Sequence, residues 1–220
     1  MTLFFRADDL GWEAERFERL ASLFAERGLR LNAAAIPLAC SATDAAARAA
    51  RFGGLLEVHS HGLAHLDREQ SGKKSEFGAA RRPEDAARDL ARSRETLRAL
   101  FAGQYYPAFV PPWNRIADSL VPLLPAAGFR VLSRAGAPRA AVAGLAELNV
   151  TVDLHTSRLP VPSAPRELLD GIDALGQEEP VGVMLHHGRM SERDFGFLAG
   201  LLDLLVARGG RTAFLSELAA

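Results

Sequence analysis

Two adjacent aspartates, Asp8 and Asp9, follow a short hydrophobic stretch at the start of the chain. Neighbouring carboxylates repel each other, and removing their water is costly unless a cation compensates their charge. The segment FFRADDLGW (residues 4–12) has the pattern of a buried strand that ends in this pair. The pair therefore predicts a cation partner at the end of the first strand.

The histidines lie at the ends of predicted strands or in the loops directly after them. There are six, namely His59, His61, His65, His155, His186 and His187. His61 and His65 are four residues apart just past a strand, so a single turn brings both imidazoles to the same side. Two histidines and one carboxylate from elsewhere form a three-ligand site with an open position, as in hydrolytic zinc sites. Asp9 or Asp8 supplies the carboxylate in this hypothesis.

Other interpretations of these residues stay open. In a purely structural one, His61 and His65 cap a loop, and the two aspartates cap a helix over residues 13–27. The gathering of polar residues at strand ends favours chemistry instead, because such ends form the functional rim of (β/α) barrels. Two histidines with a carboxylate also bind Fe(II) in oxygenases, but those sites usually lie in β-rich double sheets. His-x-His also occurs in amidohydrolases, where it normally ends the first strand.

The elements that position these residues alternate between strand and helix. We predict strands over 2–7, 29–36, 55–60, 105–110, 129–133, 148–154, 181–185 and 211–215. We predict helices over 13–27, 43–51, 83–101, 116–126, 165–175 and 192–208. Strands that alternate with helices through short loops favour an α/β fold with a parallel sheet, here a distorted (β/α) barrel of seven or eight strands. An open doubly wound sheet is the main competitor, but no Gly-rich phosphate loop follows the first strand.

The composition indicates a single globular domain over residues 1–220. The chain is 48% hydrophobic and has a net charge of −1, so it shows no electrostatic signature of nucleic-acid or anionic-membrane binding. The single cysteine, Cys40, excludes an intramolecular disulfide and favours a reducing compartment. No leader pattern and no apolar run long enough to span a bilayer is present. We therefore expect a cytoplasmic protein; the sequence leaves its oligomeric state open.

Taken together, these motifs resemble those of the polysaccharide deacetylase family (the NodB homology domain, carbohydrate esterase family 4). RADDLG (6–11) resembles the family's Asp-Asp strand end, and HGLAH (61–65) resembles its H-G-x-x-H motif. FVPPWN (109–114) is similar to its Arg-x-Pro loop. VMLHHG (183–188) resembles its Leu-x-His strand end, and TAFLSEL (212–218) resembles its last strand. The order along the chain is the family's. The resemblance implies a distorted (β/α) barrel and metal-dependent removal of an N-acyl group from an amino sugar or a related compound.

The resemblance also implies residue roles. Asp8 is the general base and His186 the general acid, and Asp9, His61 and His65 bind one divalent metal ion, with zinc favoured. The backbone N–H of Trp113 holds the oxyanion, and we group Asn114 and Arg6 with it as oxyanion or substrate contacts. The residues expected to support the ligands without binding the ion are His59, Asp153, His155 and His187. The implied substrate is a glycan or a small molecule.

The chain departs from the family pattern at Val110, where the arginine that usually pairs with the base would fall. Arg6 or Arg115 is available to replace it. The departure also motivates an alternative function, that of a non-catalytic carbohydrate-binding relative. Strand alternation distinguishes the two neighbouring histidines: His186 shares a face with Gly182 and Met184 and points into the barrel, whereas His187 orients a neighbour or packs under the following helix.

Overall fold

The computed structural model describes residues 1–139, 141–154, 164–174 and 180–220. Its strands are β1 (Thr2–Leu10), β2 (Leu31–Ala35), β3 (Leu56–Ser60), β4 (Tyr105–Phe109), β5 (Val131–Leu132), β6 (Ala146–Glu147), β7 (Val150–Asp153), β8 (Val181–Leu185) and β9 (Arg211–Thr212). Its α-helices are α1 (Ala14–Ala25), α2 (Ala42–Phe52), α3 (Pro83–Leu100), α4 (Leu123–Ala126), α5 (Pro165–Ala174), α6 (Glu192–Ala207) and α7 (Leu215–Leu218). Among the described residues, no helix is long and apolar enough to cross a membrane.

The strands form one parallel sheet that curls into a barrel. They pair in the order β6-β5-β4-β3-β2-β1-β8-β7, and β9 adds beside the start of β1. The chain after β5 also meets β7, because Val150 N–H donates to Arg134 O at 2.8 Å and Gly136 N–H donates to Val150 O at 3.0 Å. These bonds join the two ends of the sheet, so the predicted distorted (β/α) barrel is confirmed.

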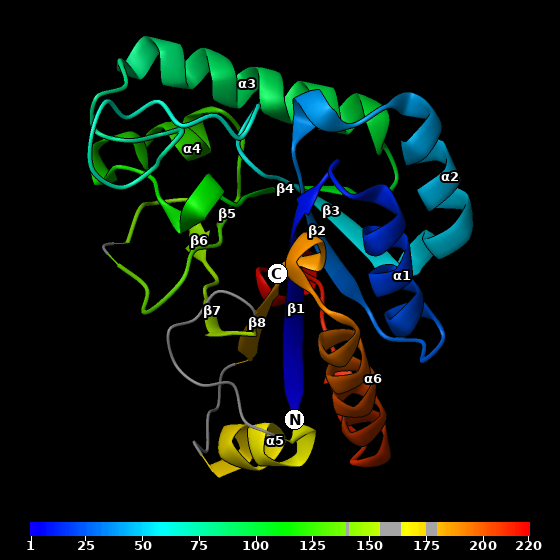
Figure 1. Cartoon of the computed structure of the whole chain (residues 1–220). Helices are drawn as coiled ribbons and strands as arrows, with labels where there is room; N and C mark the ends of the chain where they lie inside the picture. The colour runs from blue at the N-terminus through cyan, green and yellow to red at the C-terminus, as the bar shows by residue number, and fades with distance from the viewer. Residues whose placement is uncertain (140, 155–163, 175–179) are drawn as a thin grey trace.

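Helices α1, α2, α3 and α6 pack around the strands (Figure 1). Alternate residues of β1 explain why. Leu3, Phe5 and Ala7 point outward and share a hydrophobic cluster with helix residues such as Phe17 and Leu20. The outward face of each strand thus supplies the apolar surface that the amphipathic helices need.

The barrel interior leaves little space between the inward-facing side chains. Phe4 and Met184 belong to the barrel interior, and a side chain at Gly182 would lie only 2.3 Å from the Phe4 ring. Val183, which lies between Gly182 and Met184 in sequence, belongs to the outer hydrophobic cluster instead. The assignment of Gly182 and Met184 to the barrel interior is therefore confirmed. The same alternation places His186 on the inward face, at the carboxyl end of β8.

Several predicted elements differ in extent from the observed ones. Strand β1 continues past residue 7 to Leu10 and includes Asp8 and Asp9, β5 covers only Val131–Leu132, and β6 is not among the predicted strands. Two further elements differ more. The helix expected over 116–126 is broken into a 3₁₀ turn, Asp118–Leu120, and the short α4, because Pro122 and Pro125 lack the N–H that a continuous helix needs. The strand expected over 211–215 ends at Thr212, and the chain turns into α7. There Leu215 N–H donates to the buried Asn32 Oδ1 at 2.9 Å, which ties α7 to the interior of the barrel.

Candidate metal centre and active site

Both aspartates reach the site although they are neighbours on one strand. Asp8 continues the inward face of β1 after Phe4 and Arg6. Strict alternation would send Asp9 outward, but Asp9 has a φ of 70°, and the register between β1 and β2 shifts between Ala7 and Leu10. This left-handed residue lets two adjacent carboxylates face the same rim. Such a backbone is uncommon for a non-glycine residue and marks functional positions.

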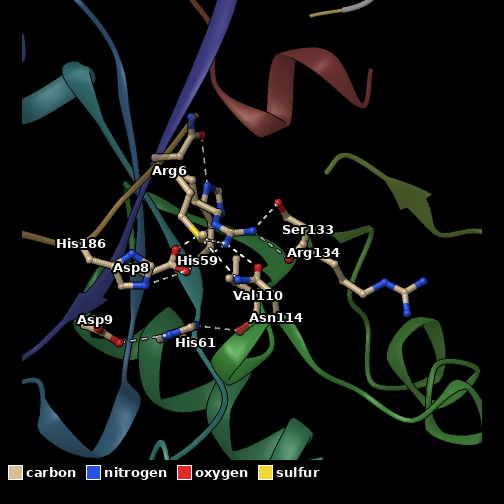
Figure 2. Close-up of polar contacts among 12 residues, drawn as sticks. Arg6, Asp8, Asp9, His59, His61, Val110, Asn114, Ser133, Arg134 and His186 are labelled. Atoms are coloured by element: carbon tan, nitrogen blue, oxygen red, sulfur yellow. Dashed lines mark hydrogen bonds and ion pairs between the residues drawn. The ribbon is translucent and has the colours of Figure 1, made fainter. Parts of the chain in front are cut away.

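Asp9, His61 and His65 form a compact triad. Asp9 Oδ1 lies 3.3 Å from Nε2 of His61 and 3.3 Å from Nε2 of His65. Figure 2 shows Asp9 opposite His61. The other ring nitrogen of His61, Nδ1, lies 2.9 Å from the carbonyl oxygen of Val110 and so donates to it. In neutral His61, Nε2 is therefore a lone-pair acceptor that faces a carboxylate oxygen, another acceptor.

A cation held between the three groups would compensate the carboxylate and accept the two imidazole lone pairs. Asp9 Oδ1 is buried and has no hydrogen-bond partner among the described residues. One ligand atom from each residue of the triad lies within 4.8 Å of the others. Two imidazole nitrogens and one carboxylate oxygen are a donor set that suits zinc and leaves a coordination position open. The residues present therefore fit a divalent metal ion.

A buried glutamate shapes the loop that carries the two histidines. The Glu76 carboxylate accepts hydrogen bonds from the backbone N–H groups of Leu63, Ala64 and His65 at 3.3, 2.9 and 3.1 Å. Glu76 is fully buried. Gly62 has a φ of 66°, and a Cβ there would lie 2.0 Å from Glu76 Oε2. No sequence pattern marked Glu76, because an acidic residue in the polar stretch 61–82 is typical of a solvated loop.

The ring of His65 contacts two tryptophans. Its centroid is 4.9 Å from that of Trp12 and 4.4 Å from that of Trp113. These are the two tryptophans of the chain. Trp113 and Asn114 have φ values of 55° and 57°, so the loop after β4 makes a strained turn beside the triad. The aromatic contacts restrict how His65 can rotate.

Arg6 forms a buried ion pair with Asp8. Its Nε and Nη2 donate to the two carboxylate oxygens of Asp8 at 2.8 and 2.9 Å. Nη1 donates to the carbonyl and hydroxyl oxygens of Ser133, both at 3.0 Å, and Nη2 also donates to Asn114 Oδ1 at 2.7 Å. Figure 2 shows the guanidinium between Asp8 on one side and Ser133 and Asn114 on the other. A planar guanidinium suits this two-pronged contact with a carboxylate.

The structure corrects the expected role of Arg6 as an oxyanion or substrate contact, because Arg6 is 0% exposed and its donors are engaged within the barrel. Asn114 Oδ1 accepts from Arg6, but Asn114 is only partly buried, so its contact with the substrate stays a prediction. The geometry also decides which arginine pairs with Asp8 although Val110 occupies the usual position. Arg115 Nη1 donates to the carbonyl oxygen of Lys74 on a distant loop, which leaves Arg6 as the partner.

The neighbouring histidines after β8 point in different directions. His186 Nε2 lies 4.0 Å from Asp8 Oδ2, and its side chain is 15% exposed. His187 is fully buried, its ring packs edge-on against Phe17 with centroids 5.4 Å apart, and its Nε2 lies 2.9 Å from the carbonyl oxygen of Trp12. His186 thus faces the rim. Burial lowers the pKa of His187, consistent with a neutral, packed side chain.

The remaining expected support residues have other surroundings. His59 lies deeper in the barrel, where Nδ1 is 3.3 Å from Tyr106 O and Nε2 is 3.2 Å from Asn32 Oδ1. Burial lowers its pKa to about 3, so it is neutral and bound to the interior rather than to the triad. Asp153 ends β7 beside Met184 of β8. His155 lies outside the described residues.

Structural comparison places this barrel among known proteins. No protein-family model and no curated protein matches the sequence. A protein from Mycobacterium smegmatis described as a polysaccharide deacetylase superposes with a TM-score of 0.72 at 16% identity, over 99% of this chain and 88% of that chain. A family 4 acetyl xylan esterase from Clostridium thermocellum, solved with a cobalt ion, gives 0.64 at 14% identity, over 99% and 90%. The chain has the fold of the family 4 carbohydrate esterases.

The same fold occurs in a protein that is not an active enzyme. A family 4 pseudoenzyme from Bacillus anthracis superposes with a TM-score of 0.61 at 14% identity, over 100% of this chain and 65% of that chain. A mutant of that pseudoenzyme is described as having restored activity. A family 4 esterase fold is therefore compatible with activity and with its absence, so the function of this chain has to be argued from its own site.

Proposed function

We propose that this protein is a metal-dependent hydrolase that removes an acyl group, such as acetyl, from the nitrogen of an amino sugar or a related N-acyl compound. One observation carries the proposal: Asp9 Oδ1 lies 3.3 Å from Nε2 of both His61 and His65 and has no hydrogen-bond partner among the described residues. A divalent ion, most simply zinc, satisfies these three ligands. When bound, zinc supplies a water molecule with a pKa lowered to roughly 7.

The chain's own residues supply both proton transfers. Asp8 accepts the proton of the attacking water, and Arg6 holds its carboxylate in a fixed orientation for this task. His186, whose Nε2 lies 4.0 Å from Asp8 Oδ2, donates a proton to the departing amine. Histidine suits this step because its usual pKa lies near neutral pH. The backbone N–H of Trp113 donates to the oxygen that gains negative charge as water adds to the carbonyl.

A non-catalytic carbohydrate-binding relative is the second candidate. The Bacillus anthracis pseudoenzyme shows that this fold exists without activity, and Val110 lacks the arginine of the family motif. The Arg6–Asp8 pair favours the enzyme, because it supplies a base with a cationic partner from within β1.

The test compares metal binding with turnover. Zinc-loaded protein is incubated with N-acetylglucosamine oligosaccharides and with small N-acetylated amines, and acetate release is measured. Release by the wild type that is lost in Asp8→Asn, with zinc retained, supports the hydrolase. Binding of the oligosaccharides without acetate release identifies the non-catalytic relative. Absence of stoichiometric zinc binding contradicts the metal site itself.

A further inference from the structure

Large apolar side chains are exposed on the loop that carries His61 and His65 and on the two loops that contact it. Trp12 is 42% exposed, Leu38 is 50% exposed and Leu66 is 52% exposed. Trp12 follows β1, Leu38 follows β2 within the 3₁₀ turn Pro37–Ala39, and Leu66 follows the ligand His65. Single exposed apolar residues are ordinary on protein surfaces. Here they occur on three successive loops at the functional end of the barrel.

These three loops touch one another. A Cβ at Gly11, next to Trp12, would lie 2.8 Å from the Cβ of Ala39, so the loop after β1 packs against the turn that carries Leu38. Leu38 N–H donates to the carbonyl oxygen of Leu63 at 3.1 Å, which joins that turn to the loop of the two ligand histidines. The Trp12 ring contacts His65, whose neighbour is Leu66. We call Trp12, Leu38 and Leu66 the apolar rim.

We propose that the apolar rim binds an apolar group that the substrate carries next to its scissile amide. The inference rests on the proposed function and narrows its substrate class. A site that recognises only sugar hydroxyls needs hydrogen-bonding side chains, and the two leucines offer none. Because Leu66 belongs to the loop of the two ligand histidines and the other two loops contact it, a hydrocarbon group within a few bonds of the scissile amide would lie beside the rim. Its burial removes apolar surface from water on both partners.

Alkyl hydroxamates provide a direct probe, because the hydroxamate group chelates zinc and the alkyl chain extends from it. Binding of acetohydroxamate and octanohydroxamate to the zinc-loaded protein is measured by calorimetry. Each fully buried methylene is worth roughly fourfold in affinity. The rim is an open surface that buries the chain only in part, so we expect octanohydroxamate to bind at least about tenfold more tightly.

The variants Leu38→Ser and Leu66→Ser test whether the rim causes this preference. We expect the advantage of the longer chain to fall below about threefold in the double variant. The affinities for zinc and for acetohydroxamate should stay at the wild-type values, because neither leucine is a ligand. Val206→Ser is the matched control: Val206 is 46% exposed on α6, far from the ligand loops in sequence, and its replacement should leave the preference intact.

Several outcomes overturn the proposal. Equal affinities for the two hydroxamates, or a preference that persists in the double variant, show that the rim does not bind the chain. Sedimentation of the protein with neutral phosphatidylcholine vesicles, or concentration-dependent dimerisation, that is lost in the double variant assigns the rim to a membrane or to a second copy instead. A protein that binds no zinc contradicts the proposed function, which is a different result from zinc binding without chain preference.

Discussion

Arg6 and Asp8 stand two residues apart on β1, and their side chains meet through two parallel hydrogen bonds of 2.8 and 2.9 Å. Both residues are almost completely buried, at 0% and 1% exposure. Their spacing places them on the same inward face of the strand. The strand thereby carries both the proposed base and the cation that compensates it, without an arginine at position 110.

This pair makes a prediction about stability. Arg6→Met leaves the Asp8 carboxylate buried without its partner, and breaking a buried ion pair in this way typically costs about 3–5 kcal/mol in the free energy of unfolding. The double variant Arg6→Met/Asp8→Asn removes the uncompensated charge, so we expect it to recover part of the loss. Urea denaturation of the two single variants and the double variant measures the coupling. Additive losses would show that the two side chains do not depend on each other.

The adjacent carboxylates should have separable roles. Asp9→Asn replaces a charged ligand oxygen of the triad and is expected to lose zinc, because an amide is a poor zinc ligand. Asp8→Asn is expected to keep zinc and lose acetate release, because an amide cannot accept the proton. Zinc content by elemental analysis and turnover on the same preparations separate the two effects. If Asp8→Asn loses zinc and Asp9→Asn does not, Asp8 is the ligand and Asp9 the base.

Glu76 should control metal affinity without touching the metal. Glu76→Ala leaves the N–H groups of Leu63, Ala64 and His65 without their acceptor, so the ligand loop loses its fixed shape. Loss of such a supporting contact typically weakens metal binding by about 10–100-fold. Because both tryptophans contact His65, quenching of tryptophan fluorescence by added Co²⁺ reports binding at this site.

The matched control for Glu76 is Glu95→Ala, which removes an exposed glutamate from α3. It should leave Co²⁺ affinity unchanged. A global loss of folding in Glu76→Ala would also reduce binding, so circular dichroism of the metal-free proteins accompanies the titration. If folded Glu76→Ala binds Co²⁺ with the wild-type affinity, Glu76 does not support the metal site.

His186 and His187 should respond differently to replacement by alanine. His186→Ala removes the proposed proton donor, so acetate release should fall by at least about 100-fold while zinc is retained. His187→Ala leaves a cavity beside Phe17 and frees the carbonyl of Trp12, so it should lower the free energy of unfolding by about 2–5 kcal/mol and keep appreciable turnover. Steady-state kinetics and denaturant unfolding on both variants test this. Reversed phenotypes would assign the acid to His187.

The buried His187 also predicts a pH dependence of stability. Burial lowers its pKa below the usual value of 6.5. The unfolded chain therefore binds a proton at a higher pH than the folded protein does. The contribution of neutral His187 is fully present above pH 6.5 and is lost as the pH falls below that value toward the lowered pKa.

The variant His187→Gln measures this contribution. Its amide still donates to the carbonyl of Trp12 but does not titrate. Between pH of about 7.5 and about 5.5, the wild type should lose up to about 1.4 kcal/mol more unfolding free energy than the variant. Urea midpoints at the two pH values provide the comparison. Parallel losses in both proteins would show that His187 does not contribute to acid sensitivity.

The amino-acid sequence determined the features that depend on local periodicity. The alternation of strands and helices indicated a (β/α) barrel, and the carboxyl ends of parallel strands gather at one rim, so the strand-end residues Asp9, His61 and His186 were expected to converge. Alternation along β8 also predicted that His186 faces Asp8 whereas His187 packs against Phe17, as the structure has them. These inferences needed only the residue types and their spacing within one element, because period-two and period-3.6 patterns act over a few residues.

Tertiary structure decided what depends on contacts between distant segments. Period two predicts opposite directions for Asp8 and Asp9, and only the left-handed backbone at Asp9 brings both to the rim. Arg6 rather than Arg115 became the partner of Asp8 because Ser133 and Asn114, more than 100 residues away, satisfy its remaining donors inside the barrel. In the sequence, Glu76 has the pattern of a surface charge, whereas in the structure its buried carboxylate accepts from three N–H groups of the ligand loop. Burial sets these choices, and burial is a property of the assembled barrel rather than of any one segment.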